Sequence, residues 1–260
     1  METSANGYSQ AQVLYGIREV WNELLGEEPS FDANTPIYEY MTTDGTWVDF
    51  DPDGFAKEFE TFFDFACSKD DWNGLFGIEV ANRSFDVWQR DVAPTLTFGA
   101  LANFILERVT AVSFAPVSVF GKRCKSAGVF KGIQQVAGRV SGKSVHFAPS
   151  SRIIDVLRGH TLDQFWRQLR WISEHSIPEL PEYWRESTNY ANCFGILAVC
   201  GAFFMMCFLG DTSYLVGTAL VWLIAYSVAL LIKYSVNPLP TKIETFKDLS
   251  LIMASMNNES

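Results

Sequence analysis

The sequence contains few of the residues from which catalytic and metal sites are usually built. Its three histidines, His146, His160 and His175, lie 14 and 15 positions apart, which is not the spacing of metal ligands. No His-Glu-x-x-His, Gly-x-Ser-x-Gly or Cys-x-x-Cys motif occurs, and paired acids such as Asp70 and Asp71 lie in turns typical of helix caps. No nucleophile, base and orienting group can be assembled, so we expect no catalytic residue, no cofactor and no metal.

Basic residues are scarce at the start of the chain, and acidic residues are missing from its middle. Residues 1–110 hold 20 acidic and 6 basic side chains, residues 111–189 hold 6 and 11, and residues 190–260 hold 4 and 3, which sums to the net charge of −10. No Asp or Glu occurs from position 109 to 154. An acidic chain is a poor general nucleic-acid binder, so we expect no nucleic-acid partner.

Charged residues are also missing from two long apolar stretches. Residues 190–209 (YANCFGILAVCGAFFMMCFL) and 215–232 (LVGTALVWLIAYSVALLI) contain no Asp, Glu, Lys or Arg, and a short polar turn separates them. Twenty helical residues span about 30 Å, the thickness of a hydrocarbon core, and backbone groups in lipid must be satisfied locally. We predict a two-helix transmembrane hairpin over 190–233; the less favoured alternative is a buried helical pair in a soluble core.

Lysine and arginine residues near the ends of these stretches predict their orientation. Five flank the hairpin on one side: Arg170, Arg185, Lys233, Lys242 and Lys247. The turn between the stretches carries none, so the positive-inside rule places both termini in the cytoplasm. The first ten residues, METSANGYSQ, lack the features of a signal peptide. We therefore expect an integral protein of the cell or inner membrane, with the lipid bilayer as a partner.

Small residues recur at helical spacing on both stretches. The candidate packing residues are Gly195, Ala198, Ala202, Ala225 and Ala229. Such residues let helices approach closely, either within the hairpin or between copies in a homo-oligomer. Neither stretch contains an ionisable side chain of the kind that transporters use, so the hairpin is interpreted as an anchor. The cysteines of the first stretch, Cys193, Cys200 and Cys207, share one stripe and are interpreted as packing residues.

Helical periodicity predicts a cytoplasmic helical domain over residues 1–110. Helices are expected over 10–25, 53–66 and 97–109, because apolar residues recur there every three or four positions. Ser68 and Asp71 have the spacing of a helix start, and long polar loops are expected between the helices. The fold class is therefore mainly α.

A basic connector of mixed α+β and loop structure is predicted over residues 111–189. It is expected to contain a strand over 112–120, a short helix around 127–136 and an amphipathic helix over 161–172. The cytoplasmic tail, 234–260, has a possible capping box at Thr241 and Glu244, followed by a short amphipathic helix. This tail helix is expected to lie on the membrane surface or to dock on the protein itself.

The front domain resembles an acyl carrier protein over residues 9–109. The features in common are an amphipathic first helix, a long acidic loop, a helix begun by an Asp-rich turn, and a closing helix at TLTFGALANFI. The resemblance implies a small helical fold that carries an acyl group on phosphopantetheine, attached to a serine where the second helix starts. The matching turn here, residues 51–55 (DPDGF), contains no serine. A carrier-like fold can lack carrier activity, since fold does not imply function.

Ser141-Gly142-Lys143-Ser144 partly matches a phosphate-binding P-loop. The first glycine of that motif would fall at position 137, which is Ala, and Pro149 would obstruct the helix that must follow. We therefore interpret this segment as a basic loop.

The basic residues of the acid-free stretch form a candidate docking patch. They are Lys122, Arg123, Lys125, Lys131, Arg139 and Lys143. Each could gain about 1 kcal/mol beside anionic lipid. The front domain, with a net charge of −14 from its 20 acidic and 6 basic residues, is an equally good counter-charge, and a solvated loop is a third interpretation.

These patterns favour a membrane-anchored, non-enzymatic adaptor. The acidic helical domain would present a surface to an unknown protein partner, or to a second copy, at the cytoplasmic membrane face. One alternative is a degenerate acyl-carrier-like domain that serves membrane-bound enzymes. Another is a membrane-associated enzyme whose site carries no recognisable motif.

Overall fold

The structure is a computed structural model that describes residues 7–25, 30–38, 42–43, 46–47, 52–173, 177–209 and 213–256. Helices dominate it, which confirms the mainly α prediction. The helices are α1 (Gln10–Leu25), α3 (Pro52–Phe63), α4 (Lys69–Phe76), α5 (Ile78–Arg83), α6 (Phe85–Asp91), α7 (Phe98–Leu106), α8 (Lys125–Ser141), α9 (Ile153–Val156), α10 (Gly159–Ile172), α11 (Glu182–Arg185), α12 (Ser187–Leu209), α13 (Ser213–Ser235) and α14 (Phe246–Met256). Two antiparallel pairs of strands join them: β1 (Thr42–Thr43) with β2 (Thr46–Trp47), and β3 (Val117–Val119) with β4 (Lys122–Cys124).

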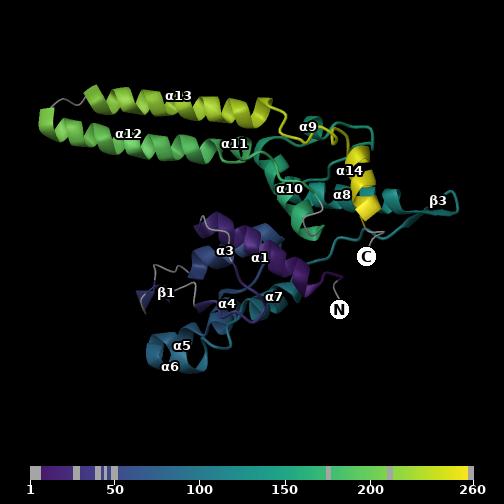
Figure 1. Cartoon of the computed structure of the whole chain (residues 1–260), viewed down its shortest axis with the longest axis horizontal. Helices are drawn as coiled ribbons and strands as arrows, with labels where there is room; N and C mark the ends of the chain where they lie inside the picture. The colour runs from purple at the N-terminus through teal and green to yellow at the C-terminus, as the bar shows by residue number, and fades with distance from the viewer. Residues whose placement is uncertain are drawn as a thin grey trace.

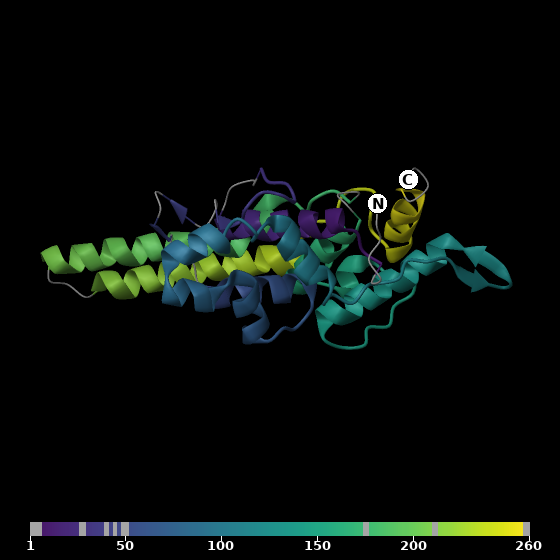
Figure 2. The ribbon, with the colours of Figure 1, turned by 90° about the horizontal axis from the view of Figure 1, so that it is seen from below.

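Two helical bodies and a protruding helical hairpin make up the molecule (Figure 1). The acidic body consists of α1 and α3–α7 with β1 and β2. The basic body consists of α8–α10 and α14, and the β-hairpin β3–β4 projects from it. The helical hairpin α12–α13 extends to the opposite end of the molecule from the β-hairpin, and the view at 90° shows the same separation (Figure 2).

Aromatic packing holds the acidic body together. Val13 and Ile17 on one face of α1 are fully buried, as the periodicity of residues 10–25 predicts. Trp21 of the same helix meets the ring of Phe98 edge-on at 5.0 Å, and Phe98 stacks on Phe31 at 3.5 Å. The predicted helices over 10–25, 53–66 and 97–109 correspond to α1, α3 and α7, of which the last two end three residues early.

Two short helices, α5 and α6, occupy a stretch that the sequence analysis assigns to loops. Gly77 ends α4 with a φ of 63° and turns the chain directly into α5. The side chain of Ser84 then caps α6 by accepting from the Val87 N–H, and Trp88 of α6 is buried with its indole N–H donating to the Phe76 carbonyl at 2.7 Å. Helices this short depend on tertiary contacts, which helical periodicity does not reveal.

The basic body differs from its prediction in the strand and in the helix that follows it. Only Val117–Val119 of the predicted strand over 112–120 pairs with another strand, because Pro116 lacks an N–H and the residues before it lie against α8. Gly128 and Gly132 leave room on α8 for the Ala115 carbonyl and the Phe114 ring. The helix runs over 17 residues, longer than the expected 127–136.

The tail helix begins later than its predicted capping box. Thr245 and Asp248, rather than Thr241 and Glu244, form the reciprocal cap: the Thr245 N–H and hydroxyl both donate to the Asp248 carboxylate, at 2.9 and 2.8 Å. An isolated bridge between Arg152 and Thr245 keeps the chain extended up to that point. The helix packs on α8, so of the two expected placements the structure shows docking on the protein.

The two bodies share one core. The ring of Trp171, at the end of α10, packs at 4.8 Å from that of Tyr8 and at 5.1 Å from that of Phe63. The Val112 N–H, just beyond the acidic body, donates to the Tyr8 hydroxyl at 2.8 Å. The boundary near residue 110 is therefore a change of charge and not a flexible linker.

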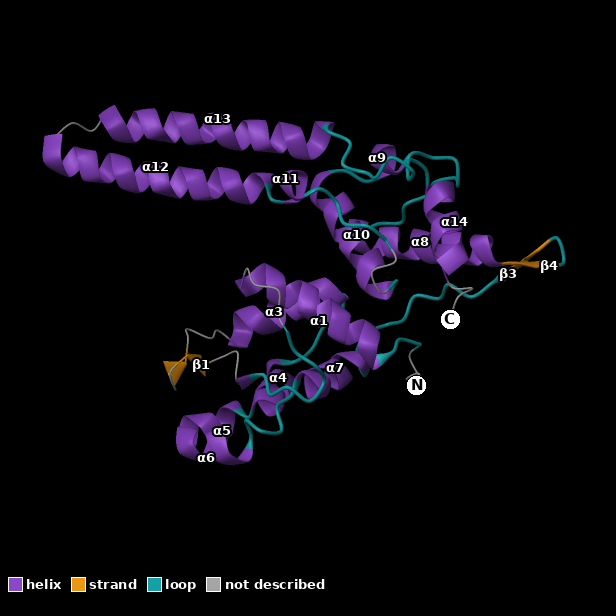
Figure 3. Ribbon diagram, viewed as in Figure 1, coloured by secondary structure: helices purple, strands orange, loops and turns teal. Residues whose placement is uncertain are grey.

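The helical hairpin contains the two predicted apolar stretches. Helices α12 and α13 pack against each other along their length; α13 contacts α10 at the base, and the far end projects beyond the two bodies (Figure 3). Among the described residues, one segment, Val216–Ser235, has the length and the mean hydropathy, 1.9, of a membrane span. The structure thus shows one helix with the character of a span, paired with a second long helix.

Candidate functional site: the helical hairpin, its base and the cleft between the bodies

The outer surface of the helical hairpin is apolar and exposed. Phe194, Ile196 and Leu197 on α12 and Leu220 and Ile224 on α13 are each more than half exposed. Isolated apolar residues are common on soluble proteins, but a continuous surface of this kind marks contact with a membrane or a partner.

Small residues form the seam between the two helices. Ala202 and Ala229 are buried there, and a Cβ at Gly195 would clash with the Trp222 ring. Ala198 and Ala225 are half-buried. Gly195, Ala202 and Ala229 therefore lie within the hairpin, and the alternative contact between copies in a homo-oligomer stays a prediction. Cys193, Cys200 and Cys207 are exposed on the outside of α12.

A buried ion pair joins the base of the hairpin to α10. Lys233, at the end of α13, is 1% exposed, and its ammonium donates to the Asp163 carboxylate at 2.9 Å and to the Arg185 carbonyl at 2.8 Å. The same ammonium lies 4.3 Å from the centre of the Trp184 ring, whose N–H donates to the Lys233 carbonyl. From the sequence, Lys233 is predicted only as a flanking cation, because the pairing of residues 70 positions apart leaves no local signal.

A second buried cation, Arg170, connects both bodies with the segment that leads into the hairpin. Its guanidinium donates to Glu19 of α1 at 3.1 Å, to the Tyr15 hydroxyl at 3.0 Å and to Glu179 at 2.6 Å. Tyr15 in turn donates to Glu19, and burial, followed by this carboxylate, raises the pKa of the Tyr15 hydroxyl well above its usual range. Arg170 is 3% exposed, so it is a structural link and not a free surface charge.

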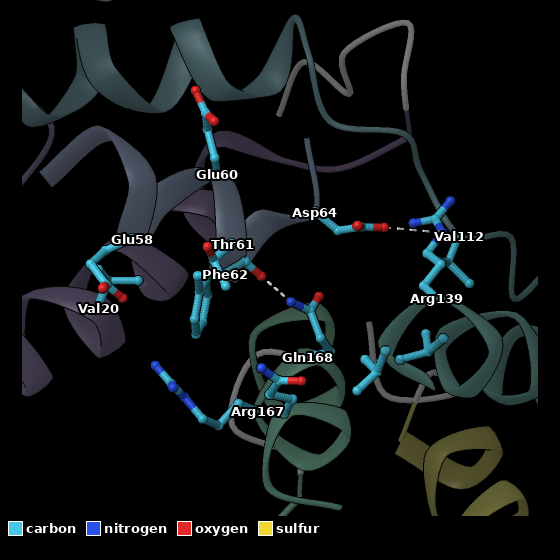
Figure 4. Close-up of a pocket in the computed structure, with 13 residues that line it drawn as sticks. Val20, Glu58, Glu60, Thr61, Phe62, Asp64, Val112, Arg139, Arg167 and Gln168 are labelled. Carbon is cyan, nitrogen blue, oxygen red and sulfur yellow. Dashed lines mark hydrogen bonds and ion pairs between the residues drawn. The ribbon is translucent and has the colours of Figure 1, made fainter. Parts of the chain in front are cut away.

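A cleft of about 290 Å³ lies between the two bodies (Figure 4). Asp64, just after α3, faces Arg139 of α8 at 3.8 Å, and the side-chain amide of Gln168 donates to the Phe62 carbonyl. The guanidinium of Arg167 lies 4.9 Å from the centre of the Phe62 ring. Acidic side chains thus come from one wall and basic side chains from the other.

The side chains that line this cleft are of the kinds that form a contact between the two bodies. Its described lining contains carboxylates, guanidiniums, amides and valines, but no Cys, His or Lys side chain. Glu60 accepts from the Trp72 indole N–H at 2.7 Å, and Arg139 also donates to the Thr110 carbonyl at 2.8 Å. Several of the polar groups are therefore already engaged in hydrogen bonds within one wall or between the two walls.

The six residues of the predicted basic patch lie on different parts of the structure. Lys122 and Arg123 are exposed on β4 in the projecting β-hairpin, and Lys125 and Lys131 follow on α8. Arg139 lies at the other end of α8, against Asp64. Lys143 is exposed in the loop after α8. The patch is thus not one surface: one part of it contacts the acidic body, and another points away from it.

The other motifs do not assemble into a site. Gly142 ends α8 and Lys143 follows it, so no helix N-terminus is offered to a phosphate where a P-loop would need one. In the described part of the chain no three His, Cys, Asp or Glu residues are placed to hold a metal ion. Helix α3 begins at Pro52 with Asp53 and Gly54, in the turn compared with the carrier serine, and Asp51 lies outside the described residues.

The chain was compared with protein families, curated proteins and solved structures. No family model, no curated protein and no solved structure matches the chain.

Proposed function

We propose that the protein is a membrane-anchored, non-enzymatic adaptor. The helical hairpin would hold it in the bilayer with both termini in the cytoplasm, and the acidic body would present a surface to a protein partner or to a second copy. The observation that carries this proposal is the exposed apolar surface of α12 and α13, whose far end projects beyond both bodies (Figure 1).

Energetics favour lipid as the environment of that surface. Burial of apolar area is worth about 25 cal/mol per Å², and each exposed Phe, Leu or Ile side chain contributes about 1.5–3 kcal/mol when it is fully covered. The small-residue seam adds support, because lipid offers no hydrophobic drive for helix pairing and close backbone approach takes its place. The buried base at Lys233 supplies a polar end to the anchor.

The acidic surface favours an adaptor role for the rest of the chain. Asp32, Glu58, Glu79, Asp86 and Glu107 are exposed on the acidic body. Charge of one sign steers the approach of a partner with the opposite charge, and this attraction weakens as salt is added. A basic protein surface is the partner chemistry that these residues fit.

Membrane integration and orientation can be tested together. In a background without the five native cysteines, Ser213→Cys should react with an impermeant maleimide added outside intact cells, and Ser4→Cys should not. The protein should also stay in the membrane pellet after alkaline carbonate treatment. Release by carbonate would refute the anchor, whereas retention with the reverse labelling would refute only the orientation.

A further inference from the structure

The β-hairpin β3–β4 presents an aromatic side chain to solvent at its tip. Phe120 is 103% exposed, the highest value among the exposed large apolar side chains, and Val119 beside it is 39% exposed. Phe120 has a φ of 51° and Gly121 a φ of 78°, so both central residues of this two-residue turn have positive φ, as type I′ turns require. A bulky residue in that conformation is unusual, and such strain is typical of functional positions.

The surroundings of this tip are basic. Lys122 and Arg123 follow the turn directly and are exposed, and no acidic residue occurs between positions 109 and 154. An aromatic side chain flanked by cations matches a surface that offers negative charge with an apolar layer just beneath it. Anionic lipid headgroups above acyl chains have this arrangement.

The size of the tip favours lipid over a protein partner. A specific protein interface buries about 800 Å² on each side and uses some 20–30 residues. The β-hairpin comprises only the eight residues from Val117 to Cys124. A bilayer surface needs no matching shape, so an aromatic residue and neighbouring cations add an apolar and an electrostatic contribution to reversible docking.

We propose that the β3–β4 tip docks on anionic lipid of a second membrane, facing the one that holds the helical hairpin. The second membrane follows from the position of the tip, which lies at the opposite end of the molecule from α12–α13 in both views (Figures 1 and 2). The involvement of a second membrane rests on the proposed membrane anchor, whereas the affinity of the tip for anionic lipid is independent of that anchor.

The test uses the full-length chain in nanodiscs of phosphatidylcholine, mixed with liposomes of phosphatidylcholine and phosphatidylglycerol in a two-to-one ratio. The nanodisc-held chain should float with these liposomes and not with liposomes of phosphatidylcholine alone. Binding should fall as salt is raised, because exposed charges are screened.

Two variants measure the contribution of the β3–β4 tip to liposome binding. Phe120→Asn creates an Asn-Gly turn, which type I′ hairpins prefer, so the fold is kept while the aromatic ring is lost; binding should fall at least about tenfold. The double variant K122Q/R123Q should lose roughly thirtyfold. The control K57Q/R83Q removes the same charge from exposed positions of the acidic body and should bind like the wild type.

Several outcomes would overturn the proposal. One is equal flotation with both kinds of liposome, and another is wild-type binding by both tip variants. A third is no flotation at all while a photo-crosslinker at position 120 captures an acidic protein in cells. Failure of the chain to enter nanodiscs would instead refute the membrane anchor, and the nanodisc-free chain would still report on the tip in the same flotation assay.

Discussion

At the residue scale, the cap of α14 shows how a few polar atoms fix where a helix begins. The Asp248 N–H donates to the Thr245 hydroxyl at 3.2 Å, and the Asp248 carboxylate accepts from the Thr245 N–H and hydroxyl. These bonds, led by the Thr245 backbone N–H, lower the pKa of the Asp248 carboxyl. The ionised carboxylate therefore stabilises the folded tail.

The sign of the pH dependence follows from that direction. Because the folded pKa of Asp248 is below its unfolded value, its stabilisation is complete above the unfolded pKa, about 4, and is lost as the pH falls through the folded pKa. Asp248→Asn should lower the free energy of unfolding at pH 7, and the gap to the wild type should close in acid. Chemical denaturation in detergent at a series of pH values measures this gap. A gap that stays constant down to pH 3 would contradict the assignment.

Thr245 provides a matched comparison at the same cap. Thr245→Ala should cost about 1 kcal/mol of stability, whereas Thr245→Ser, which keeps the hydroxyl, should cost much less. Equal losses from the two substitutions would show that the methyl group of Thr245, and not its hydroxyl, stabilises the helix start.

At the element scale, local signals predicted α1, α3, α7, α10 and the two long helices, because apolar spacing within each segment sets its helical face. The capping box at Ser68 and Asp71 is confirmed as well, because the spacing of its two polar residues is also a local signal. Pairings between distant segments were not predictable. Lys233 with Asp163 and Arg170 with Glu19 both depend on tertiary contacts that leave no trace in nearby residues.

The Lys233–Asp163 pair predicts how strongly the helical hairpin is attached to α10. Removal of one partner from a buried pair typically costs about 3–5 kcal/mol, because the other charge stays buried without compensation. Lys233→Met alone should therefore destabilise the protein strongly, and the double variant K233M/D163L should recover most of the loss. Thermal unfolding in detergent gives the double-mutant cycle. Additive losses would mean that the two side chains act independently.

At the scale of the whole molecule, Arg170 forms a polar connection between the acidic body and the segment that leads into the base of the hairpin. In both views the acidic body lies beside the basal part of the hairpin, and not beyond its end (Figures 1 and 2). With an upright hairpin, part of that body would lie at the depth of the bilayer. We therefore expect the hairpin to tilt in the bilayer, as transmembrane helices commonly do.

Loss of Arg170 should loosen this arrangement. Arg170→Met removes the bonds to Glu19, Tyr15 and Glu179 and leaves Glu19, whose side chain is 15% exposed, without its cation. Hydrogen exchange should then rise in α1 and in the segment before α11, while α12 and α13 stay protected. Arg90→Met is the control, since Arg90 is exposed and pairs only with its neighbour Asp91 among the interactions described. Unchanged exchange in α1 would refute the link.

The burial of Lys233 has a consequence for the order of events during synthesis. A chain that enters a membrane is oriented by cations that are still free, yet in the finished molecule this lysine is neutralised by Asp163. The aspartate is made first, but its partner emerges only in the last turn of the second long helix, 70 residues later. If the hairpin inserts as proposed, Lys233 first acts as a free cation that helps to orient the hairpin. Once the hairpin has inserted, the same lysine pairs with Asp163 and fixes the base of the hairpin to α10.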